Sequence, residues 1–498
     1  MEARLMNYVL GLDLGTGSLK GLLIDQKGKI VTTKSSEYEI ISTHPGYSEQ
    51  RPHDWIKAAK KVIQDIITEI PQAAEKIDAI SFSGQMHSLV LLDEAGAVLR
   101  NAILWNDVRT TAQCATIMDQ MGDQLIEITK NKALEGFTLP KLLWVKENEP
   151  DVWNKVARFL LPKDYLGFWL TGHQQMEYSD AAGTLLLDVT HKMWSTEILK
   201  TFGIPAIICP PLVNSIDSIG TVTKELAAEL GLKNEVKVIA GGADNACAAV
   251  GAGIVHENTA MCSIGTSGVF LAYEPDGTKN YSGHLHYFNH AEPDKYYSMG
   301  VTLAAGHSLD WFKKTFAKDL SFEELLSGVK EVAAGSDGLF FTPYIVGERT
   351  PYTDSQVRGS FIGMDVHHTL KHFTRAVLEG ITFSLKDSQL LMEQYTGKSF
   401  AQIVSVGGGA KNKDWLQMQA DMFNAKVVTL ETEQGPAIGA AMLAAVGTGW
   451  YKTIEACAAE WVVFKEEYLP NAETANHYQQ LHKKYQEIYP ATKPLFKP

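Results

Sequence analysis

Apolar and polar positions along the first eighty residues predict three strands, a helix and a further strand. The three strand-like apolar runs are at residues 8–14, 19–24 and 29–33. Their close spacing, with a turn at Gln26–Gly28, predicts an antiparallel meander. Residues 54–70 carry apolar side chains at helical spacing up to Pro71, so we expect a helix that ends there. With the strand expected at 77–83, this order is typical of an α/β lobe.

The second half of the chain repeats this order of elements. A strand-like run at residues 236–240 comes near the end of the first lobe, and runs at 259–264, 269–273 and 403–406 follow in the second. The first of these runs leads into a small-residue helix up to about residue 251, and the last leads into three glycines and a helix from about Asn412. The repetition suggests an internal duplication, with an N-terminal lobe over residues 1–255 and a C-terminal lobe over residues 256–498.

Three other segments complete the pattern. A hairpin is expected over residues 88–104, and residues 136–170, rich in Trp, Lys and Pro, predict a helical insertion that walls a cleft. A turn-rich segment follows at 171–194. Residues 468–490 have a helical pattern, and we expect its apolar face to pack on the second lobe or on a neighbouring molecule. That face carries Tyr478, Leu481, Tyr485 and Ile488.

Composition and net charge limit the classes of partner that the protein is expected to bind. The 498 residues, 45% of them hydrophobic, are enough for two or three domains with sizeable cores. A net charge of −13 argues against nucleic acid or an anionic membrane and favours a small molecule. The five cysteines form no Cys-x-x-Cys pair, so neither a disulfide framework nor a zinc site is expected. Residues 1–7 lack an apolar signal core and residues 435–449 are too short for a membrane span, which favours a cytoplasmic protein.

Two glycine turns carry the strongest chemical signal. They are Asp13–Ser18 (DLGTGS) and Ser263–Gly268 (SIGTSG), each between two predicted strands. Glycine lets backbone N–H groups approach an anion closely, and Thr or Ser adds a hydroxyl donor. Neither turn has the spacing of a Walker loop, and neither opens a helix as a Rossmann fingerprint does. Either turn alone is also typical of an ordinary hairpin, but the pair favours two lobes that face one phosphate chain.

Two aspartates lie at predicted strand ends, where α/β proteins gather their active sites. Asp13 abuts the first glycine turn, and a carboxylate beside phosphates implies that Mg²⁺ lies between them. The alternative for Asp13 is a turn-forming side chain that bonds to its own backbone. Asp244 follows the strand at 236–240 and begins a helix, which suits a helix cap, a general base, or both.

Two polar segments are candidates for a polyol pocket. Gly84–Ser88 interrupts one strand pair, and Trp105–Asp107 follows the next strand. A hydroxyl-rich ligand needs several donors and acceptors and often an aromatic wall, which Trp105 would supply. Core packing is the alternative for Met86 and Trp105, and a satisfied buried histidine is the alternative for His87.

Three glycine-rich or charged segments have less specific interpretations. Gly407–Ala410 suits either a ligand-binding turn or close packing of a strand on a helix, and Asn412 would cap that helix. Gly435–Ala441 is interpreted as a tightly packed helix start. Glu348–Arg349 is expected to form a buried ion pair without a chemical role.

Two longer stretches, Gly136–Asn148 and Gly359–Glu379, are similar to patterns of the FGGY-type carbohydrate kinase family of the actin-like ATPase superfamily, and the resemblance covers about residues 8–450. Within the family, residues 83–87, 103–110 and 347–351 look most like members that phosphorylate D-xylulose. Glycerol kinases typically carry Arg-Glu in place of Met86-His87, and D-xylulose kinases commonly have Gly in place of Ser88. The resemblance implies two duplicated actin-like (ribonuclease H-like) α/β lobes, with the active site in the cleft between them.

The resemblance also implies roles for individual residues. Asp244 would be the catalytic general base, and Asp13 would help to hold Mg²⁺. The positions that match the family's sugar contacts are Met86, His87, Trp105, Asp107 and Asn245. The positions expected at the nucleotide are Thr16, Gly265, Thr266, Gly306, Gly408, Gly409 and Asn412.

An ATP- and Mg²⁺-dependent kinase that converts D-xylulose to D-xylulose 5-phosphate is therefore expected, with the sugar on the N-terminal lobe and the nucleotide on the C-terminal lobe. One alternative is a kinase for another sugar, polyol or aldonate, such as ribulose or gluconate. Another is an actin-like switch in which ATP drives a partner interaction. The sequence leaves the exact sugar, the regulation and the formation of a homodimer open.

Overall fold

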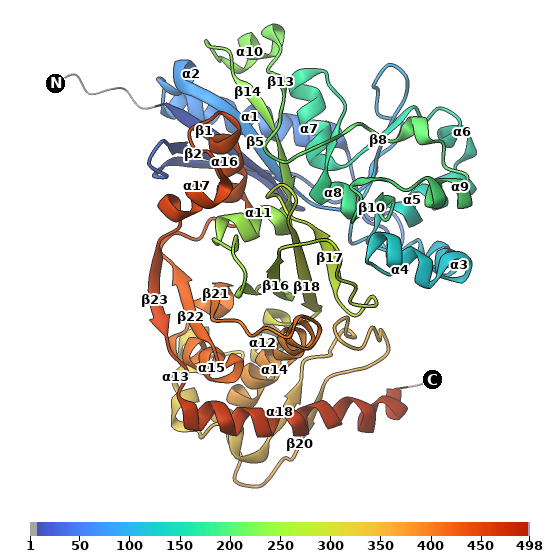
Figure 1. The fold of residues 1–498 in the computed structure, drawn as a ribbon. Coiled ribbons are helices and arrows are strands. Elements are labelled where there is room, and N and C mark those ends of the chain that lie inside the picture. The colour runs from blue at the N-terminus through green and yellow to red at the C-terminus, as the bar shows by residue number, and fades with distance from the viewer. Residues whose placement is uncertain (1–6, 497–498) are drawn as a thin grey trace, which may run out of the picture.

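The computed structural model describes residues 7–496, so the leader at residues 1–6 lies outside it. It consists of two lobes, each built on one mixed β-sheet with helices packed around it (Figure 1). The first sheet has the strand order β13-β14-β5-β1-β2-β3. Its strands are β1 (Tyr8–Leu14), β2 (Ser18–Asp25), β3 (Ile30–Glu37), β5 (Ile77–Gly84), β13 (Ser218–Thr221) and β14 (Lys237–Ala243). The predicted meander is confirmed, because β2 pairs antiparallel with both β1 and β3.

The second sheet has the strand order β17-β18-β16-β15-β21-β22-β23. Its strands are β15 (Thr259–Ile264), β16 (Gly268–Glu274), β17 (His286–Asn289), β18 (Tyr296–Thr302), β21 (Gln402–Gly407), β22 (Lys426–Leu430) and β23 (Phe464–Tyr468). The strands predicted on either side of the second glycine turn are therefore present, and β15 and β16 pair antiparallel across that turn.

Five strands of each sheet share one arrangement. In the first lobe β1, β2 and β3 form an antiparallel meander, β5 lies parallel to β1, and β14 lies parallel to β5. In the second lobe β15, β16 and β18 form the meander, β21 lies parallel to β15, and β22 lies parallel to β21. This repeated topology confirms the predicted duplication and the α/β class.

The helix α1 (Pro52–Glu69) covers one face of the first sheet and confirms the helix predicted at 54–70. Its buried side chains recur at helical spacing and pack toward β2 and β3. They include Trp55, Ala59, Val62, Ile63 and Ile66. Each fully buried aliphatic side chain of this kind contributes about 1.5–3 kcal/mol. Glycine at position 21 of β2 leaves the room that Val62 and Ile66 occupy.

Two short helices join the lobes. α11 (Asp244–Gly251) follows β14, and α16 (Pro436–Gly447) belongs to the second half of the chain yet packs on α11, β1 and β5 of the first sheet. A Cβ on Gly439 would collide with the backbone oxygen of Cys247, so only glycine allows this approach. The predicted tight packing of this helix start is confirmed. The division of the chain into two lobes at residue 255 stays a proposal. Although α16 comes after this position in the sequence, it packs on the sheet of the first lobe.

The predicted helical insertion is largely confirmed. It contains α5 (Thr138–Asn148), α6 (Pro150–Trp153) and α7 (Pro162–Thr171), with a short strand β8 (Arg158–Leu160) between the last two. The hairpin predicted over 88–104 is confirmed in its antiparallel pairing, because Leu89 lies opposite Ile103 and Leu92 lies opposite Val98. β6 (Val90–Leu92) forms its ladder with β8, and β7 (Ala102–Ile103) forms one with β4 (Glu49–Gln50). The two arms of the hairpin pair with each other through isolated bridges, and each arm also pairs with a strand outside the hairpin.

The other elements connect these parts. In the first lobe they are α2 (Ala73–Lys76), α3 (Thr111–Met121), α4 (Asp123–Thr129), β9 (Met176–Glu177), α8 (Tyr178–Ala182), β10 (Leu187–Asp188), β11 (Met193–Trp194), α9 (Thr196–Thr201), β12 (Leu212–Val213) and α10 (Lys224–Leu230). In the second they are α12 (Gly306–Phe316), α13 (Phe322–Ser327), β19 (Phe340–Thr342), β20 (Ser360–Ile362), α14 (Leu370–Thr396), α15 (Lys413–Phe423), α17 (Ile454–Trp461) and α18 (Ala472–Thr492). The segment expected to be turn-rich at 171–194 thus contains the short helix α8 and three two-residue strands.

The C-terminal helix α18 packs across the second lobe, at the foot of Figure 1. Its predicted apolar face is buried. Tyr478 donates to the carboxylate of Glu379 in α14 at 2.7 Å, and the hydroxyls of Tyr485 and Tyr344 lie 3.0 Å apart. Of the two expected positions for this face, the second lobe is therefore the one observed.

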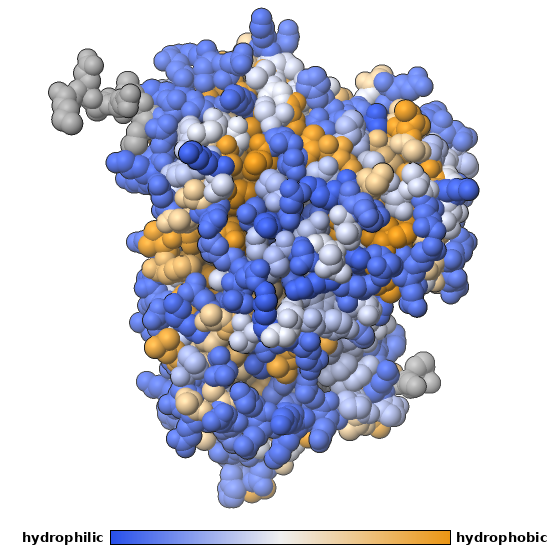
Figure 2. All heavy atoms as spheres, viewed as in Figure 1, coloured by the Kyte–Doolittle hydropathy of each residue, from blue (hydrophilic) through white to orange (hydrophobic). Residues whose placement is uncertain are grey.

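The face shown in Figure 2 is mainly hydrophilic, with scattered hydrophobic patches, as expected for a chain of net charge −13. Within residues 7–496, no helix is both long enough and apolar enough to cross a membrane. The five cysteines are free and buried.

Replacement of Gly439 by Ala should lower the free energy of unfolding by about 1–3 kcal/mol, because the new methyl group meets rigid backbone rather than a flexible side chain. Urea unfolding followed by fluorescence would measure it. Gly17→Ala is the matched control, since a Cβ there has no atom within 4 Å. Equal stability of the two variants would contradict the tight contact between α11 and α16.

Candidate active site

The carboxyl ends of three parallel strands bring two aspartates to one edge of the first sheet. Asp13 of β1 lies opposite Ser83 of β5, and Gly84 of β5 lies opposite Ala243 of β14. Asp244 follows directly as the first residue of α11. Because parallel strands end at the same edge, Asp13 and Asp244 are close enough for their charges to interact.

The surroundings of both aspartates favour protonation. Burial raises the pKa of Asp13 to about 6, although the Ser83 hydroxyl and the charge of Lys20 act to lower it. Burial raises the pKa of Asp244 to about 7, and the charge of Asp13 adds to this rise. Asp244 Oδ1 accepts hydrogen bonds from the backbone N and side-chain Nδ2 of Asn245, at 2.7 and 3.1 Å, which oppose the shift. A carboxyl group with a pKa near neutrality suits a general base.

The first glycine turn is tied to a candidate sugar residue. Trp105 Nε1 donates to Thr16 Oγ1 at 3.0 Å, and Gln50 Nε2 donates to the backbone oxygen of Thr16 at 2.6 Å. The Thr16 hydroxyl accepts from Trp105, so its own proton remains free to be donated to a ligand. Trp105 is 45% exposed, so core packing does not account for it. Ser88 has a role here as well, because its hydroxyl accepts from the backbone N of Trp105 at 3.0 Å.

The second glycine turn lines a cleft of about 900 Å³ in the second lobe. Six of the seven positions expected at the nucleotide line this cleft: Gly265, Thr266, Gly306, Gly408, Gly409 and Asn412. Gly306 begins α12 and donates its N–H to the oxygen of Gly265 at 2.8 Å, and a Cβ on Gly306 would collide with that oxygen. Asn412 accepts from the backbone N of Trp415 at 2.9 Å, which confirms it as the cap of α15. The seventh position, Thr16, lies on the other lobe.

A smaller cavity of about 220 Å³ reaches the base candidate. Its lining includes Asp244, Asn245, Ser263 and the segment Glu433–Pro436 that precedes α16. It therefore brings a catalytic candidate of the first lobe beside residues of the second lobe.

Lys20 lies in the candidate active site but is not among the residues predicted from the sequence. It lies opposite Asp13 in the β1–β2 hairpin, and its Nζ donates to Gln434 Oε1 at 2.5 Å. The neighbouring Glu433 accepts from the backbone N of Gly407 at 2.6 Å, so the same segment also holds the glycine turn beside the large cleft. The available signal was a lysine within an apolar strand, in register with Asp13.

The imidazole of His87 is held in one tautomer. Its Nδ1 lies 2.6 Å from the oxygen of Gly183. A carbonyl oxygen only accepts, so Nδ1 carries the proton and Nε2 is left as an acceptor. The ring centroid lies 4.7 Å from that of Phe137 and 6.0 Å from that of Phe288. Burial lowers the pKa of His87 to about 3, and the charges of nearby Lys141 and Arg349 contribute.

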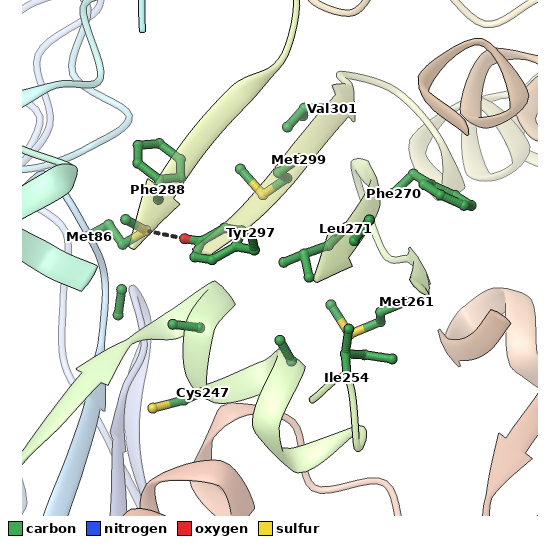
Figure 3. Close-up of a cluster of buried hydrophobic side chains, with 14 of the residues drawn as sticks. Met86, Cys247, Ile254, Met261, Phe270, Leu271, Phe288, Tyr297, Met299 and Val301 are labelled. Atoms are coloured by element: carbon green, nitrogen blue, oxygen red, sulfur yellow. Dashed lines mark hydrogen bonds between the residues drawn. The ribbon is translucent and has the colours of Figure 1, made fainter. Parts of the chain in front are cut away.

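Met86 and Asn245 lie together beside a second-lobe tyrosine. Tyr297 of β18 donates to Met86 Sδ at 3.8 Å, and Asn245 Nδ2 lies 4.0 Å from the same sulfur. Figure 3 shows the Met86 sulfur and the Tyr297 hydroxyl pointing toward one another. Met86 is buried, so packing accounts for part of its position, while Asn245 is partly exposed.

Asp107 is placed differently from the other sugar candidates. It is fully buried, and its two oxygens accept from Ser48 N at 2.6 Å, from Arg109 N at 3.0 Å, and from the Arg109 guanidinium at 2.9 and 2.7 Å. These four hydrogen bonds use all the lone-pair directions of the carboxylate. Arg109 in turn stacks 4.8 Å from the ring of Trp144. In this geometry Asp107 anchors the 105–109 turn, and a contact with a sugar stays a prediction.

The two family-like stretches each contain a charged side chain with several hydrogen-bond partners. Lys141 donates to the backbone oxygens of Glu135 and Phe137 at 3.0 and 2.9 Å, which fixes the loop that carries Phe137 against His87. Glu379 accepts from Arg375 at 2.8 Å and from Tyr478 of α18.

The ion pair expected between Glu348 and Arg349 is not formed in the described part of the chain. Glu348 instead accepts from Leu303 N and Ser384 Oγ, both at 3.1 Å. This carboxylate thereby ties the end of β18, just before α12, to α14.

A metal ion would find few protein ligands here. Within residues 7–496 no three His, Cys, Asp or Glu side chains are arranged to hold one. Mg²⁺ commonly binds through one or two carboxylates while phosphates and waters complete its shell, and the oxygens of Asp13 and Asp244 suit that pattern.

Comparison with known proteins identifies close relatives. Models of the FGGY family of carbohydrate kinases match residues 8–251 with the N-terminal domain and residues 260–448 with the C-terminal domain. The xylulose kinase of Bacillus subtilis (strain 168) is 54% identical over 490 residues, which are 98% of each chain.

Solved structures with the same fold act on more than one substrate. The ligand-bound xylulose kinase of Lactobacillus acidophilus is 29% identical with a TM-score of 0.94, and the match covers 98% of this chain and 99% of that one. The gluconate kinase of the same organism has the same identity and TM-score, with 99% of each chain covered. The similarity of fold therefore does not separate these two substrates.

The imidazole of His87 should stay neutral and protonated at Nδ1 between pH 5 and pH 8, because burial keeps its pKa at about 3. Two-dimensional ¹H–¹⁵N NMR of histidine-labelled protein would report the tautomer, with His87→Gln used to assign the signal. A His87 signal that titrates with a midpoint near its ordinary pKa of about 6.5 would contradict this geometry.

Proposed function

The chain belongs to the FGGY family of carbohydrate kinases, and from that premise we propose that it transfers the γ-phosphoryl group of ATP to the 5-hydroxyl of D-xylulose. The products are D-xylulose 5-phosphate and ADP. The observation that carries the proposal is the Asp13–Asp244 pair at the strand ends, of which Asp244 lines a cavity between the two lobes. The 54% identity to the xylulose kinase of Bacillus subtilis supports the choice of sugar.

Asp244 is the general base of the proposed reaction. Its pKa of about 7 gives it an ionised fraction at neutral pH and enough basicity to take the proton of the attacking hydroxyl. Asn245 restrains Asp244 Oδ1 through two hydrogen bonds, so the other oxygen is left to face the substrate. Most of the acceleration comes from in-line positioning and neutralisation of phosphate charge, as in other phosphoryl transfers.

The nucleotide occupies the cleft of about 900 Å³ in the second lobe. Backbone N–H groups of Gly265 and Thr266 face the phosphates from that lobe, and the Thr16 hydroxyl faces them from the first lobe. Gly408 and Gly409 let the nucleoside approach the backbone. Lys20, beside Asp13, adds a positive charge to the same region and reaches Gln434 across the lobes.

Mg²⁺, when bound, neutralises phosphate charge and orients the transferred group. Asp13 is the residue proposed to hold it, directly or through a water molecule, and the charge of the ion would also lower the pKa values of both aspartates.

D-Xylulose is proposed to bind against His87, Asn245, Met86 and Trp105. The unprotonated Nε2 of His87 accepts a hydrogen bond from a sugar hydroxyl, and the exposed indole of Trp105 forms the apolar wall. Asp107 holds the turn that carries Trp105, and its own contact with the sugar stays a prediction. Gluconate is the second candidate, on the ground that the gluconate kinase of Lactobacillus acidophilus shares the fold at a TM-score of 0.94.

Location and assembly stay predictions. The five free cysteines favour the reducing cytoplasm. The net charge of −13 continues to favour small-molecule partners over nucleic acid or anionic membranes. A homodimer is left as an open possibility by the sequence, and no interface is proposed. The actin-like switch loses support, because both family models that match the chain are models of carbohydrate kinases.

Replacement of Asp244 by Asn should lower kcat by about 10²- to 10⁴-fold, because the hydroxyl loses its proton acceptor. The affinity for ATP should change little, since the proposed nucleotide cleft lies in the other lobe. A coupled ADP-release assay with D-xylulose gives kcat, and titration calorimetry gives the affinity. Asp319→Asn, at an exposed site, is the control. Wild-type kcat in the Asp244 variant would remove this residue from the role of base.

The wild-type activity should fall on the acid side of pH 7. The base acts only when ionised. Its pKa is about 7 without a ligand and bound Mg²⁺ lowers it, so kcat/KM for D-xylulose should decline with a slope near one at a pH below 7. The profile is measured at saturating ATP and Mg²⁺. A profile that stays flat between pH 5.5 and pH 8 would contradict a base with this pKa.

Replacement of His87 by Ala should raise the KM for D-xylulose by roughly 10- to 100-fold, since the sugar loses a hydrogen bond and a shaped wall. The KM for ATP should change less than about threefold. Both constants come from the same coupled assay, with gluconate and ribulose tested beside D-xylulose. Equal increases in the two KM values would point to general damage instead of a sugar contact.

A further inference from the structure

The short helix α8 lies between two elements of the proposed site. At its start, Ser179 Oγ accepts a hydrogen bond from the backbone N of Ala243 at 2.9 Å. Just beyond its end, the oxygen of Gly183 accepts from His87 Nδ1 at 2.6 Å. Ala243 is the residue before Asp244, and it marks the corner at which β14 turns into α11. α8 and the residue after it thus contact the backbone beside Asp244, the proposed base, and the imidazole of His87, a proposed sugar-binding residue.

The hydroxyl of Ser179 has a fixed direction. It lies 2.9 and 2.8 Å from the two carboxylate oxygens of Glu177, which have no proton to give when the group is ionised. The single hydroxyl proton of Ser179 therefore points toward Glu177, and a lone pair points toward the N–H of Ala243. Ser179, Glu177 and Ala243 are all fully buried, so no solvent molecule replaces a partner that is removed.

A cluster of buried charges keeps this arrangement in place. Lys163 Nζ lies 2.6 Å from Asp164, 3.1 Å from Asp180 and 3.3 Å from Glu177. Although burial acts to lower it, the charges of Asp164, Asp180 and Glu177 raise the pKa of Lys163 well above its ordinary value. The stem of Lys163 also packs on Gly84, where a Cβ would lie 2.9 Å from Lys163 Cβ. The cluster is thereby fixed to the end of β5.

Buried charges of this kind are costly, and they tolerate little displacement because each depends on its partners. Glu177 uses its oxygens to cap α8, where it accepts from the backbone N of Ser179 at 2.7 Å and of Asp180 at 2.8 Å. It also accepts from Ser215 Oγ at 2.9 Å. The position of α8 is therefore set by the same carboxylate that orients the Ser179 hydroxyl.

We propose that Ser179 is a positioning residue for phosphoryl transfer: it holds the β14–α11 corner and thereby aims the carboxylate of Asp244, while the Lys163–Glu177–Asp180 cluster holds Ser179. This inference rests on the proposed function of Asp244. A positioning role predicts a loss of kcat without a matching rise in KM, because a loosened corner misdirects the base without removing the sugar or nucleotide contacts. A displacement of about 1 Å at such a position costs on the order of 10²-fold in rate.

The chain provides a closely matched control. Ser215 is a buried serine that donates to the same Glu177 carboxylate, but no hydrogen bond of its hydroxyl reaches Ala243 in the described residues. Ser179→Ala removes both the bond to Glu177 and the bond from Ala243. Ser215→Ala removes only a bond to Glu177. The difference between the two variants isolates the contact with the corner.

The experiment compares wild type, Ser179→Ala, Ser215→Ala and Asp244→Asn at saturating ATP and Mg²⁺ with varied D-xylulose. We expect Ser179→Ala to lower kcat by about 10- to 100-fold while the KM for D-xylulose changes less than about threefold, because the oxygen of Gly183 still holds His87. Ser215→Ala should keep kcat within about twofold of wild type. Thermal unfolding of each variant accompanies the kinetics, and Ser179→Cys replaces Ser179→Ala if the latter does not fold.

Two results would overturn the proposal. One is a wild-type kcat in a folded Ser179 variant. The other is an equal loss of kcat in the Ser179 and Ser215 variants, which would mean that both serines act only by stabilising Glu177. Asp244→Asn separates this failure from that of the proposed function. If Asp244→Asn is inactive while Ser179→Ala is normal, only the positioning role fails, whereas an active Asp244→Asn removes the base itself.

Discussion

Asp13 and Asp244 are close enough for their charges to interact and burial removes part of their hydration, so this molecule holds two carboxylates in an unfavourable position. The cost appears in their pKa values, which burial raises to about 6 and about 7. Lys20 reduces the cost by its charge opposite Asp13, and Asn245 reduces it by two hydrogen bonds to Asp244. Such strain persists only where the surrounding structure fixes it, and it is common at catalytic sites.

The duplicated topology explains how the two lobes divide the work. In the first lobe the ends of β1 and β14 present carboxylates, whereas in the second lobe the equivalent edge presents glycine turns that lead from β15 and β21. One edge therefore suits the attacking hydroxyl and a cation, and the other suits phosphates and a nucleoside. α16 connects them, because it begins beside the small cavity and packs on the first sheet against α11. The segment Glu433–Gln434, just before α16, contacts both Lys20 and the turn at Gly407.

The features that could be predicted are those encoded locally. The meander, α1 and the helix from Asn412 follow from periodicity and caps, and the aspartates follow from their place at strand ends. The hairpin at 88–104 also follows from its own residues, whereas its further pairing with β8 could not be predicted, because β8 comes from the insertion. The contacts of Asp107 could not be predicted for a similar reason, since Ser48, far away in the sequence, donates to one of its oxygens. The tautomer of His87 depends on Gly183, which only the folded chain brings near.

The most direct test of this account is a crystal structure of the protein with D-xylulose, Mg²⁺ and a non-hydrolysable ATP analogue. The account predicts that an Asp244 carboxylate oxygen lies within about 3 Å of the 5-hydroxyl, that this hydroxyl faces the γ-phosphate in line, and that Asp13 lies in the shell of the metal ion. A sugar bound with its 5-hydroxyl away from Asp244, or a nucleotide outside the cleft lined by Gly265, Gly408 and Asn412, would contradict it.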